Sequence, residues 1–115
     1  MNDQQRDFFR LIYPPADRPN IKIEESRFPV GDLSEMGIKF FHQETIKFPV
    51  GVRMKGTIIF KDGSKCEVEG DILRVDVDST PAFTVVEFVK GIPMAKMLEE
   101  QRILIKKYKR GVELT

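Results

Sequence analysis

The most constraining feature of the sequence is an alternating segment at residues 52–60. One face carries only apolar residues and glycine, namely Val52, Met54, Gly56, Ile58 and Phe60, and the polar residues Arg53, Lys55 and Thr57 lie on the other face. A period of two is that of a β-strand with one buried face. Asp62-Gly63 follows, and both residues tolerate positive φ, so the chain is predicted to turn there into a strand that begins near Ser64. An antiparallel sheet is therefore expected.

Further short segments favour strands. Residues 21–24 alternate, and the apolar positions resume at residues 28–30 on the opposite parity, which predicts a bend or bulge near residue 26. Met36, Ile38 and Phe40 alternate in the next segment.

The return strand of the Asp62-Gly63 hairpin is expected to be followed by one further strand. The apolar residues Cys66 and Val68 lie at even-numbered positions, whereas Leu73, Val75 and Val77 lie at odd-numbered ones. The apolar face therefore changes sides along the strand, which predicts a bulge at Gly70-Asp71. Residues 83–89 have apolar residues on both faces, so burial on both sides is expected.

A helical period of 3.6 appears only near the C-terminus, and a helix is predicted over residues 92–110. Its apolar stripe is expected to be Met94, Met97, Leu98, Gln101, Leu104, Ile105 and Tyr108, with Glu99 and Glu100 off the stripe. Pro93 suits a first helical turn, and Gly111 suits a stop. Five or six strands followed by one helix predict a small antiparallel barrel or sandwich closed by the helix.

Composition narrows the possible partners. The 115 residues suffice for a single domain, 1–115, and 19 Lys and Arg against 18 Asp and Glu leave a net charge of +1. This balance argues against a nucleic acid polymer as partner. The chain has one cysteine, no apolar run long enough for membrane insertion, and no signal-peptide pattern at its start, so a cytoplasmic protein is expected.

Catalytic residues are not expected. The only histidine, His42, has no nucleophile or base at motif spacing and is expected on the surface at a strand end. Asp76 and Asp78 share a strand face, an arrangement typical of solvated carboxylates. His42 and Cys66 lack the paired spacing of a zinc site, and no glycine-rich phosphate loop is present, so neither a metal site nor a cofactor is predicted.

Two constellations point to a binding site instead. Arg6 and Arg10 place two guanidiniums four residues apart before the first clear strand, where they could grip phosphate or a guanine edge. The alternative is a solvated tail whose Phe8 and Phe9 pack on the barrel.

The second constellation is Asp32, Ser34 and Gly37. The carboxylate could accept from the N1–H and 2-amino group of guanine, the hydroxyl could donate to phosphate, and the glycine would allow a close approach of ligand to the backbone. The alternative is a connecting turn in which Asp32 and Ser34 cap backbone groups.

In this order the two motifs, Arg-x-x-x-Arg and Asp-x-Ser-x-x-Gly, resemble those of the PilZ domain family of bacterial cyclic di-GMP receptors. The resemblance extends over the chain, including residues 28–34, the Asp62-Gly63 hairpin, residues 70–74 and residues 86–88. It implies a six-stranded antiparallel β-barrel with a C-terminal helix and a flexible N-terminal arm, residues 1–12. It also implies that the ligand, cyclic di-GMP, is bound by Arg6, Arg10, Asp32, Ser34 and Gly37.

The resemblance further implies a receptor that is not an enzyme. Such a receptor changes conformation on binding and regulates motility, adhesion, biofilm or polysaccharide output through a protein partner. Many members have another arginine directly before the pair, where this chain has Gln5, so one or two bound dinucleotides are compatible with the motif. Arg74, at a strand end, is a further candidate for lining the site.

Two alternatives remain open. A PilZ-like adaptor would bind protein with little or no nucleotide binding, through a surface that includes Ile103 on the helix. A small barrel for single-stranded nucleic acid would need a basic groove with stacking aromatics, whereas basic and acidic residues are interspersed here and Trp is absent.

Overall fold

The alternating segment forms the predicted hairpin. β5 (Arg53–Ile59) pairs antiparallel with β6 (Lys65–Asp76) along its whole length. In the turn, the Gly63 amide donates to the Phe60 carbonyl over 2.9 Å, and Gly63 has a φ of 89°. Glycine adopts this φ without a steric penalty, so the local sequence determines where the chain reverses.

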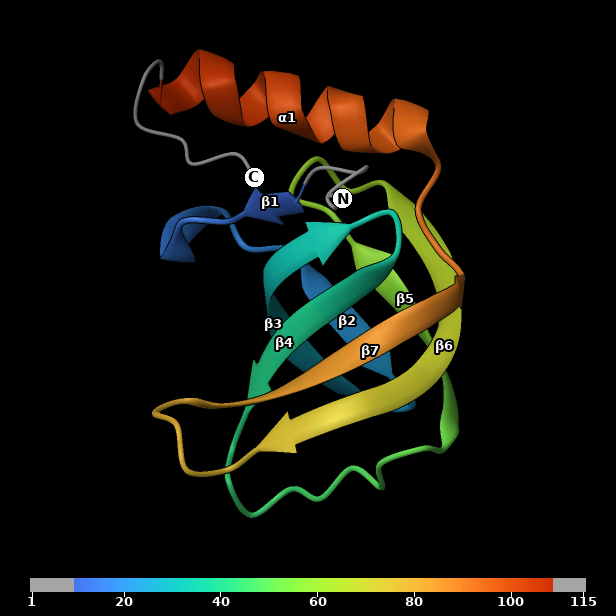
Figure 1. The fold of residues 1–115 in the computed structure, drawn as a ribbon. Coiled ribbons are helices and arrows are strands. Elements are labelled where there is room, and N and C mark those ends of the chain that lie inside the picture. The colour runs from blue at the N-terminus through green and yellow to red at the C-terminus, as the bar shows by residue number, and fades with distance from the viewer. Residues whose placement is uncertain (1–9, 109–115) are drawn as a thin grey trace, which may run out of the picture.

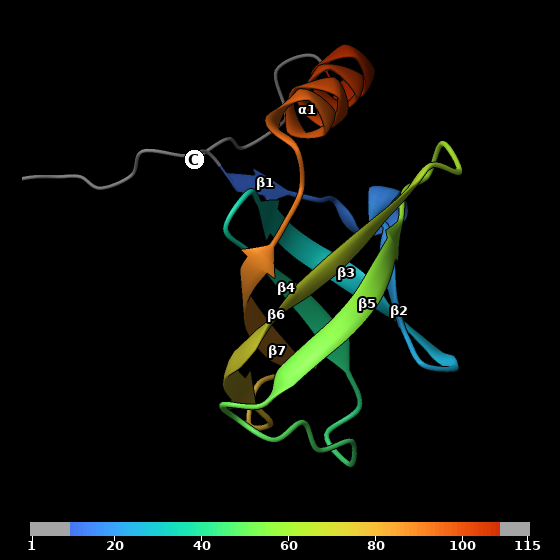
Figure 2. The same cartoon turned by 90° about the vertical axis from the view of Figure 1, so that its right-hand side faces the viewer.

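The structure is a computed structural model that describes residues 10–108. Besides β5 and β6, its elements are β1 (Arg10–Ile12), the short 3-10 helix η2 (Pro15–Asp17), β2 (Asn20–Ile23), β3 (Ser26–Ser34), β4 (Gly37–His42), β7 (Ala82–Lys90) and the helix α1 (Met94–Tyr108). The strands β2-β3-β4-β7-β6-β5 pair in this order, and β5 pairs back to β2 (Figures 1 and 2). The six-stranded antiparallel barrel with a C-terminal helix is therefore confirmed.

β1 lies outside this closed ring. It pairs with β3 at residues 32–34, whereas β2 pairs with β3 at residues 26–29. Both short strands therefore follow the same edge of β3, and β4 occupies the other edge. The residues that precede β1, including Arg6 and most of the predicted arm, lie outside the described residues.

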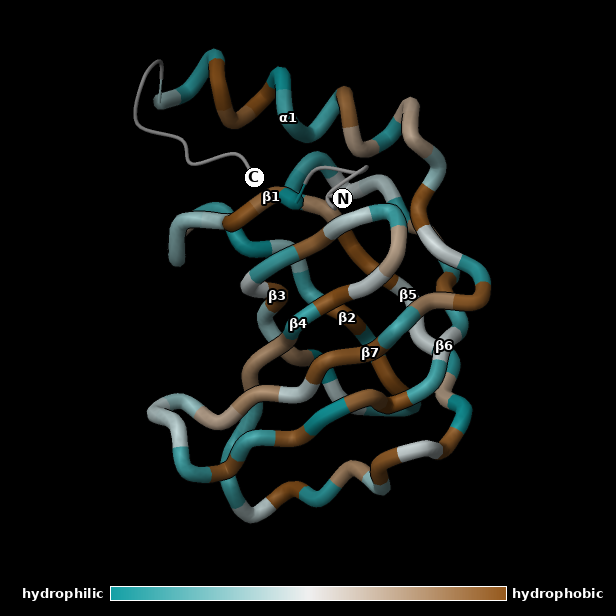
Figure 3. The backbone as a smooth tube through the Cα atoms, viewed as in Figure 1, coloured by the Kyte–Doolittle hydropathy of each residue, from teal (hydrophilic) through white to brown (hydrophobic). Residues whose placement is uncertain are grey.

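The inward faces of the strands fill the barrel. Val30, Leu33, Phe40, Ile58 and Val86 are fully buried. Burial of side chains of this size contributes roughly 1.5–3 kcal/mol each, so this interior is the main source of stability. Figure 3 shows the hydrophobic positions recurring along the strands and along α1.

Two β-bulges and one turn set the phase of the strands. The parity change near residue 26 is a hairpin turn at Glu24-Glu25, which places Ile23 opposite Ser26. The register of β6 on β7 shifts between Glu69 and Gly70, where Val89 of β7 is the extra residue, and again between Ile72 and Arg74. Val68 and Ile72 are both buried, so β6 keeps one inward face across Gly70 and the predicted change of face at Gly70-Asp71 is wrong. Leu73 is the extra residue of the bulge between Ile72 and Arg74 and is 57% exposed, so its predicted inward position is wrong.

The outer face of β7 differs from the prediction. Phe83 and Val85 are half-buried rather than buried, because within residues 10–108 no second layer of strands or helix covers them. Cationic side chains of β4 and β6 partly cover Phe83 instead.

α1 lies across one end of the barrel, beside β1 (Figures 1 and 2). Met97 and Leu104 are buried as predicted, but Met94, Leu98 and Ile105 are about 40% exposed. Glu100 was expected off the buried stripe and is only 6% exposed, because its carboxylate accepts a hydrogen bond from the hydroxyl of Tyr13. The helix thus faces the barrel about one residue position away from the predicted stripe.

Polar contacts hold both ends of α1. Lys96 pairs with Asp62 in the β5–β6 turn, and Lys107 and Tyr108 both bind the carboxylate of Asp17 in η2. Residues 109–110 of the predicted helix lie outside the described residues. Within residues 10–108 there is no helix with the length and apolar character needed to span a membrane.

Candidate binding site

The structure brings the described part of the two motifs together. Arg10 on β1 is the cross-strand partner of Ser34 on β3, and Ile12 is the partner of Asp32. Cross-strand partners point to the same side of a sheet, and Leu11, between them, is buried on the other side. Arg10, Asp32 and Ser34 therefore share the outer face of the barrel.

A β-bulge sets the orientation of Asp32. The register of β3 on β4 places Val30 opposite Phe40 and Asp32 opposite Lys39, so Gly31 is the extra residue. In a regular strand without the bulge, residue 32 would share the inward face of Val30. The bulge instead turns Leu33 inward and leaves Asp32 half-buried on the outer face.

Asp32 begins a row of cross-strand neighbours on four strands. Lys39 on β4 lies opposite Asp32, Val85 on β7 lies opposite Lys39, and Arg74 on β6 lies opposite Val85. The bulge at Leu73 of β6 creates the last of these pairings, since it brings Arg74 into register with Val85. The row therefore places two cations beside the predicted site residues.

These side chains surround one hollow of about 270 Å³. It is lined by Arg10, Asp32, Ser34, Gly37, Ile38, Lys39, Arg74 and Val85. Three cations and one carboxylate give the hollow an excess of positive charge, which suits an anion that also offers hydrogen-bond donors. Lys39 was not identified as a site residue from the sequence. Its position two residues after Gly37, on the outward face of β4, is the feature that could have indicated it.

Phe83 orients the two additional cations. The Lys39 Nζ lies 4.7 Å from the centre of the Phe83 ring, and the Arg74 guanidinium carbon lies 5.4 Å from it. Cation–π contacts of this kind contribute about 0.5–1 kcal/mol at exposed sites. Phe83 thus supports both side chains at the rim of the hollow.

Ser34 has a structural role in the turn from β3 to β4. Its Oγ accepts hydrogen bonds from the amides of Met36 and Gly37, each over 3.1 Å. The predicted turn-capping alternative is therefore present for Ser34. The Ser34 hydroxyl also donates a long hydrogen bond of 3.5 Å to the Gly37 carbonyl oxygen, so donation to a ligand requires it to leave this acceptor.

Gly37 is required by the fold. A Cβ at this position would lie 2.7 Å from the carbonyl oxygen of Val86 on β7. The close approach is thus between two strands of the barrel, whereas the sequence suggested an approach of ligand to the backbone.

His42 is buried rather than on the surface as predicted. Its exposure is 8%, its Nε2 lies 2.7 Å from the Thr84 Oγ1, and its ring packs near Phe48. This satisfied environment assigns His42 to the core.

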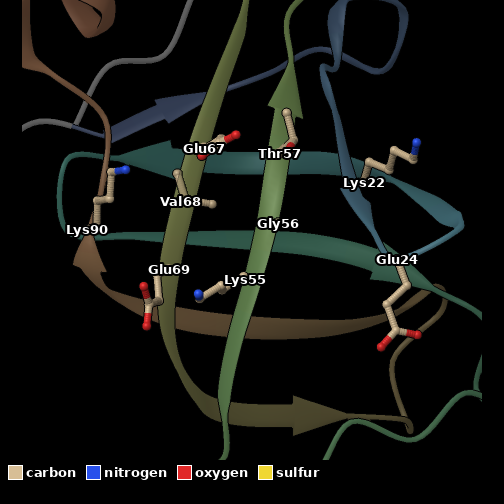
Figure 4. Close-up of a pocket in the computed structure, with 9 residues that line it drawn as sticks. All are labelled: Lys22, Glu24, Lys55, Gly56, Thr57, Glu67, Val68, Glu69 and Lys90. Carbon is tan, nitrogen blue, oxygen red and sulfur yellow. The ribbon is translucent and has the colours of Figure 1, made fainter.

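Another hollow, of about 460 Å³, lies on the outer face of β2, β5 and β6 (Figure 4). Its charged residues are Lys22, Lys55 and Lys90 with Glu24, Glu67 and Glu69. Lys55 is the cross-strand partner of Glu69, which in turn is the partner of Lys90. The charges balance, so this face selects neither anions nor cations. Within the described residues there is no group of three or more His, Cys, Asp or Glu side chains arranged to hold a metal ion.

The sequence matches the family model of the PilZ domain over residues 4–108. The barrel with its terminal helix, and the motif residues on its outer face, define the class of protein, and the match covers most of the chain. The protein belongs to the PilZ domain family. No curated protein matches the sequence.

Solved structures share the fold at low sequence identity. The PilZ domain of YcgR from Escherichia coli with c-di-GMP aligns with a TM-score of 0.71 at 15% identity, covering 93% of this chain and 99% of that one. The Bacillus subtilis inhibitor of motility, MotI/DgrA, gives 0.69 at 16% identity, covering 94% of this chain and 53% of that one. YcgR from Escherichia coli in complex with c-di-GMP aligns with a TM-score of 0.61 at 18% identity, covering 92% of this chain and 47% of that one. The chain therefore spans about half the length of MotI and of the longer YcgR chain.

Proposed function

We propose that this protein is a cytoplasmic receptor for cyclic di-GMP. The observation that carries the proposal is the convergence of Arg10, Asp32, Ser34 and Gly37 on one cationic hollow, although the residues come from different strands. PilZ membership and the c-di-GMP bound to the PilZ domain of YcgR support this choice of ligand. The proposed role is that of a sensor and not of an enzyme.

Each side chain has a role that fits its chemistry. Arg10 and Arg6 bind phosphates and guanine edges with planar guanidiniums. Asp32 accepts from the N1–H and 2-amino group of guanine, which adenine cannot match. Ser34 donates to a phosphate oxygen, and Lys39 and Arg74 add charge on the far side of the hollow.

The size of the hollow implies that it is only part of the site. Its volume of about 270 Å³ is below the roughly 300–1,000 Å³ of typical ligand pockets. We propose that residues 1–9 of the predicted arm supply the missing wall by closing over the dinucleotide, because residues 10–12 already form β1 against β3. Ordering costs roughly 1–2 kcal/mol per residue, which charge-assisted bonds to the phosphates offset. The closed arm would then change the surface offered to a protein partner that controls motility, adhesion, biofilm or polysaccharide output.

A second candidate function is a protein-binding adaptor with little nucleotide affinity. The exposed apolar side chains of α1 favour it: Ile103 is 45% exposed and Ile105 is 41% exposed.

Calorimetry with cyclic di-GMP separates the two. The receptor proposal expects micromolar or tighter binding that weakens roughly tenfold or more in Arg6→Ala, Arg10→Ala and Asp32→Ala, because each variant loses charge-assisted bonds. Arg53→Ala is the matched control, since Arg53 is a surface arginine on β5 that pairs with Asp71. Absence of binding heat and of any thermal shift in the folded wild-type protein would reject the receptor and favour the adaptor.

A further inference from the structure

A separate hollow of about 620 Å³ opens on the outer side of β3 and β4, beyond Phe41. It is lined by Arg18, Ser26, Arg27, Phe28, Pro29, Phe41, His42, Gln43, Ile46 and Pro81. Two arginines and no acidic residue contribute to this lining. The hollow therefore differs from the charge-balanced face of β2, β5 and β6 (Figure 4), and it shares no residue with the cyclic di-GMP hollow.

Arg18 is prepared for an anion. Its guanidinium carbon lies 4.5 Å from the centre of the Phe41 ring, so one face of the guanidinium is covered by an aromatic side chain. Its Nε is buried and has no hydrogen-bond partner among the atoms that the structure describes. A buried donor without an acceptor costs about 1–3 kcal/mol, and a rotation of the side chain that brings the Nε to an anion in the hollow would remove this cost.

The bulge of β3 holds the aromatic ring in place. A Cβ at Gly31 would lie 2.5 Å from the Cε2 atom of Phe41, so the ring occupies space that any other residue type at position 31 would fill. The Lys39 Nζ lies 5.6 Å from the centre of the same ring. Phe41 is thus an apolar wall of this hollow, and Lys39, which lines the first hollow, lies over the same ring.

The remaining walls are mostly apolar. Pro29 on β3, Ile46 in the β4–β5 loop and Pro81 before β7 line the hollow together with Arg18, and Arg27 is exposed. The volume lies within the range of pockets that enclose small molecules, which are largely apolar with a few placed polar groups.

We propose that this hollow is a second ligand site, which binds a small molecule carrying a carboxylate or phosphate on a flat apolar body. Arg18 binds the anionic group through the edge of its guanidinium, Arg27 adds charge at the mouth, and Phe41 with its apolar neighbours contacts the body. The proposal does not require that the protein bind cyclic di-GMP.

Phenyl phosphate is the probe, followed by amide and arginine Nε–H resonances in ¹H–¹⁵N spectra. Saturable shifts are expected at Arg18, Arg27, Phe41 and Gln43, with affinity at least roughly tenfold weaker in Arg18→Ala because a charge-assisted bond is lost. Arg18→Lys is expected to bind more weakly than wild type, because it keeps the charge and loses the planar edge. Phenol has the aromatic ring without the anionic group, and inorganic phosphate has the anionic group without the ring. Both are expected to bind more weakly than phenyl phosphate. Benzoate distinguishes a carboxylate from a phosphate preference.

Several outcomes would overturn the proposal. Equal shifts in wild type and in a folded Arg18→Ala variant would do so, as would shifts confined to Asp32, Gly37 and Arg74, which would place the probe in the other hollow. If Arg18→Ala does not fold, loss of the same shifts in Arg27→Ala is required, since Arg27 is exposed. Asp32→Ala tests independence from the receptor proposal, and phenyl phosphate binding is expected to be unchanged in this variant.

Discussion

The Tyr13 hydroxyl donates a 2.8 Å hydrogen bond to the carboxylate of Glu100, and both side chains are buried. Tyr13 follows directly after β1, and Glu100 lies in the middle of α1, so one contact joins the strand that carries Arg10 to the terminal helix. Burial raises the pKa of Glu100, while the Tyr13 hydroxyl and the Lys96 ammonium, 3.6 Å from the Glu100 Oε2, act in the opposite direction. α1 is therefore attached to the segment after β1 through the buried carboxylate of Glu100, and the charge of this carboxylate is stabilised by Tyr13 and Lys96.

Tyr13→Phe is expected to lower the free energy of unfolding by about 1–3 kcal/mol near pH 7, because the buried Glu100 carboxylate loses its donor. Loss of the donor also raises the pKa of Glu100 further. Glu100 in the native variant then takes up a proton at a higher pH than it does in the native wild-type protein. The difference in the free energy of unfolding between the two proteins should therefore narrow as the pH falls toward about 4.

Urea unfolding of both proteins at the two pH values measures this difference. In a Glu100→Gln background, Tyr13→Phe should have an effect that no longer varies with pH, since the titrating group is gone. If Tyr13→Phe alone lowers the free energy of unfolding equally at both pH values, the Tyr13 hydroxyl does not donate to an ionised carboxylate.

Ser34→Ala is expected to lower stability by about 1 kcal/mol, since the amides of Met36 and Gly37 lose their acceptor. Binding of cyclic di-GMP should weaken as well, because the turn positions Gly37 and its neighbours at the hollow. Thermal unfolding and calorimetry test the two effects, with Ser26→Ala, an exposed serine at the start of β3, as control. Unchanged stability would mean that the hydroxyl does not cap the turn in solution.

Gly37→Ala is expected to destabilise the barrel by roughly 1–3 kcal/mol, because the added methyl group would lie 2.7 Å from the Val86 carbonyl oxygen and would force β4 and β7 apart. Met36→Ala, in the same turn and 43% exposed, should have little effect. Chemical unfolding of the two variants provides the comparison. A Gly37→Ala protein as stable as wild type would contradict the close approach of the strands.

Lys39→Ala and Arg74→Ala should each weaken cyclic di-GMP binding, by roughly two- to tenfold, because each removes a cation from the hollow. Arg74→Lys should retain part of the affinity, since the charge remains while the planar group over Phe83 is lost. Calorimetry at two salt concentrations measures both effects, and the salt dependence should decrease in the alanine variants. Lys65→Ala, at the exposed start of β6, is the control. Equal affinity in all variants would restrict the site to the motif residues.

The sequence predicted those parts of the fold that depend on neighbouring residues. The Asp62-Gly63 turn was predictable because Gly63 adopts a positive φ that few other residues tolerate. The position of Leu73 was not, because a bulge depends on how β6 pairs with β7 and leaves only a weak local pattern. The buried face of α1 was misplaced for a similar reason, since the partner of Glu100 lies 87 residues away in the chain.

The candidate site shows the same division. The motifs supplied Arg10, Asp32, Ser34 and Gly37, and strand pairing brings these residues to one hollow. Lys39 has no motif around it, and its place beside Asp32 follows only from the bulge at Gly31 and the register of β3 on β4. Phe41 and Arg18 likewise meet only in the folded chain.

The position of β1 outside the ring has a consequence for cooperativity. The barrel closes through the pairing of β5 with β2, so detachment of β1 would break no bond of the ring. Segments of this kind form separate units in native-state hydrogen exchange and open below the energy of global unfolding. β1 could therefore exchange between docked and free states while the six-stranded ring stays closed, at the cost of exposing the buried Leu11.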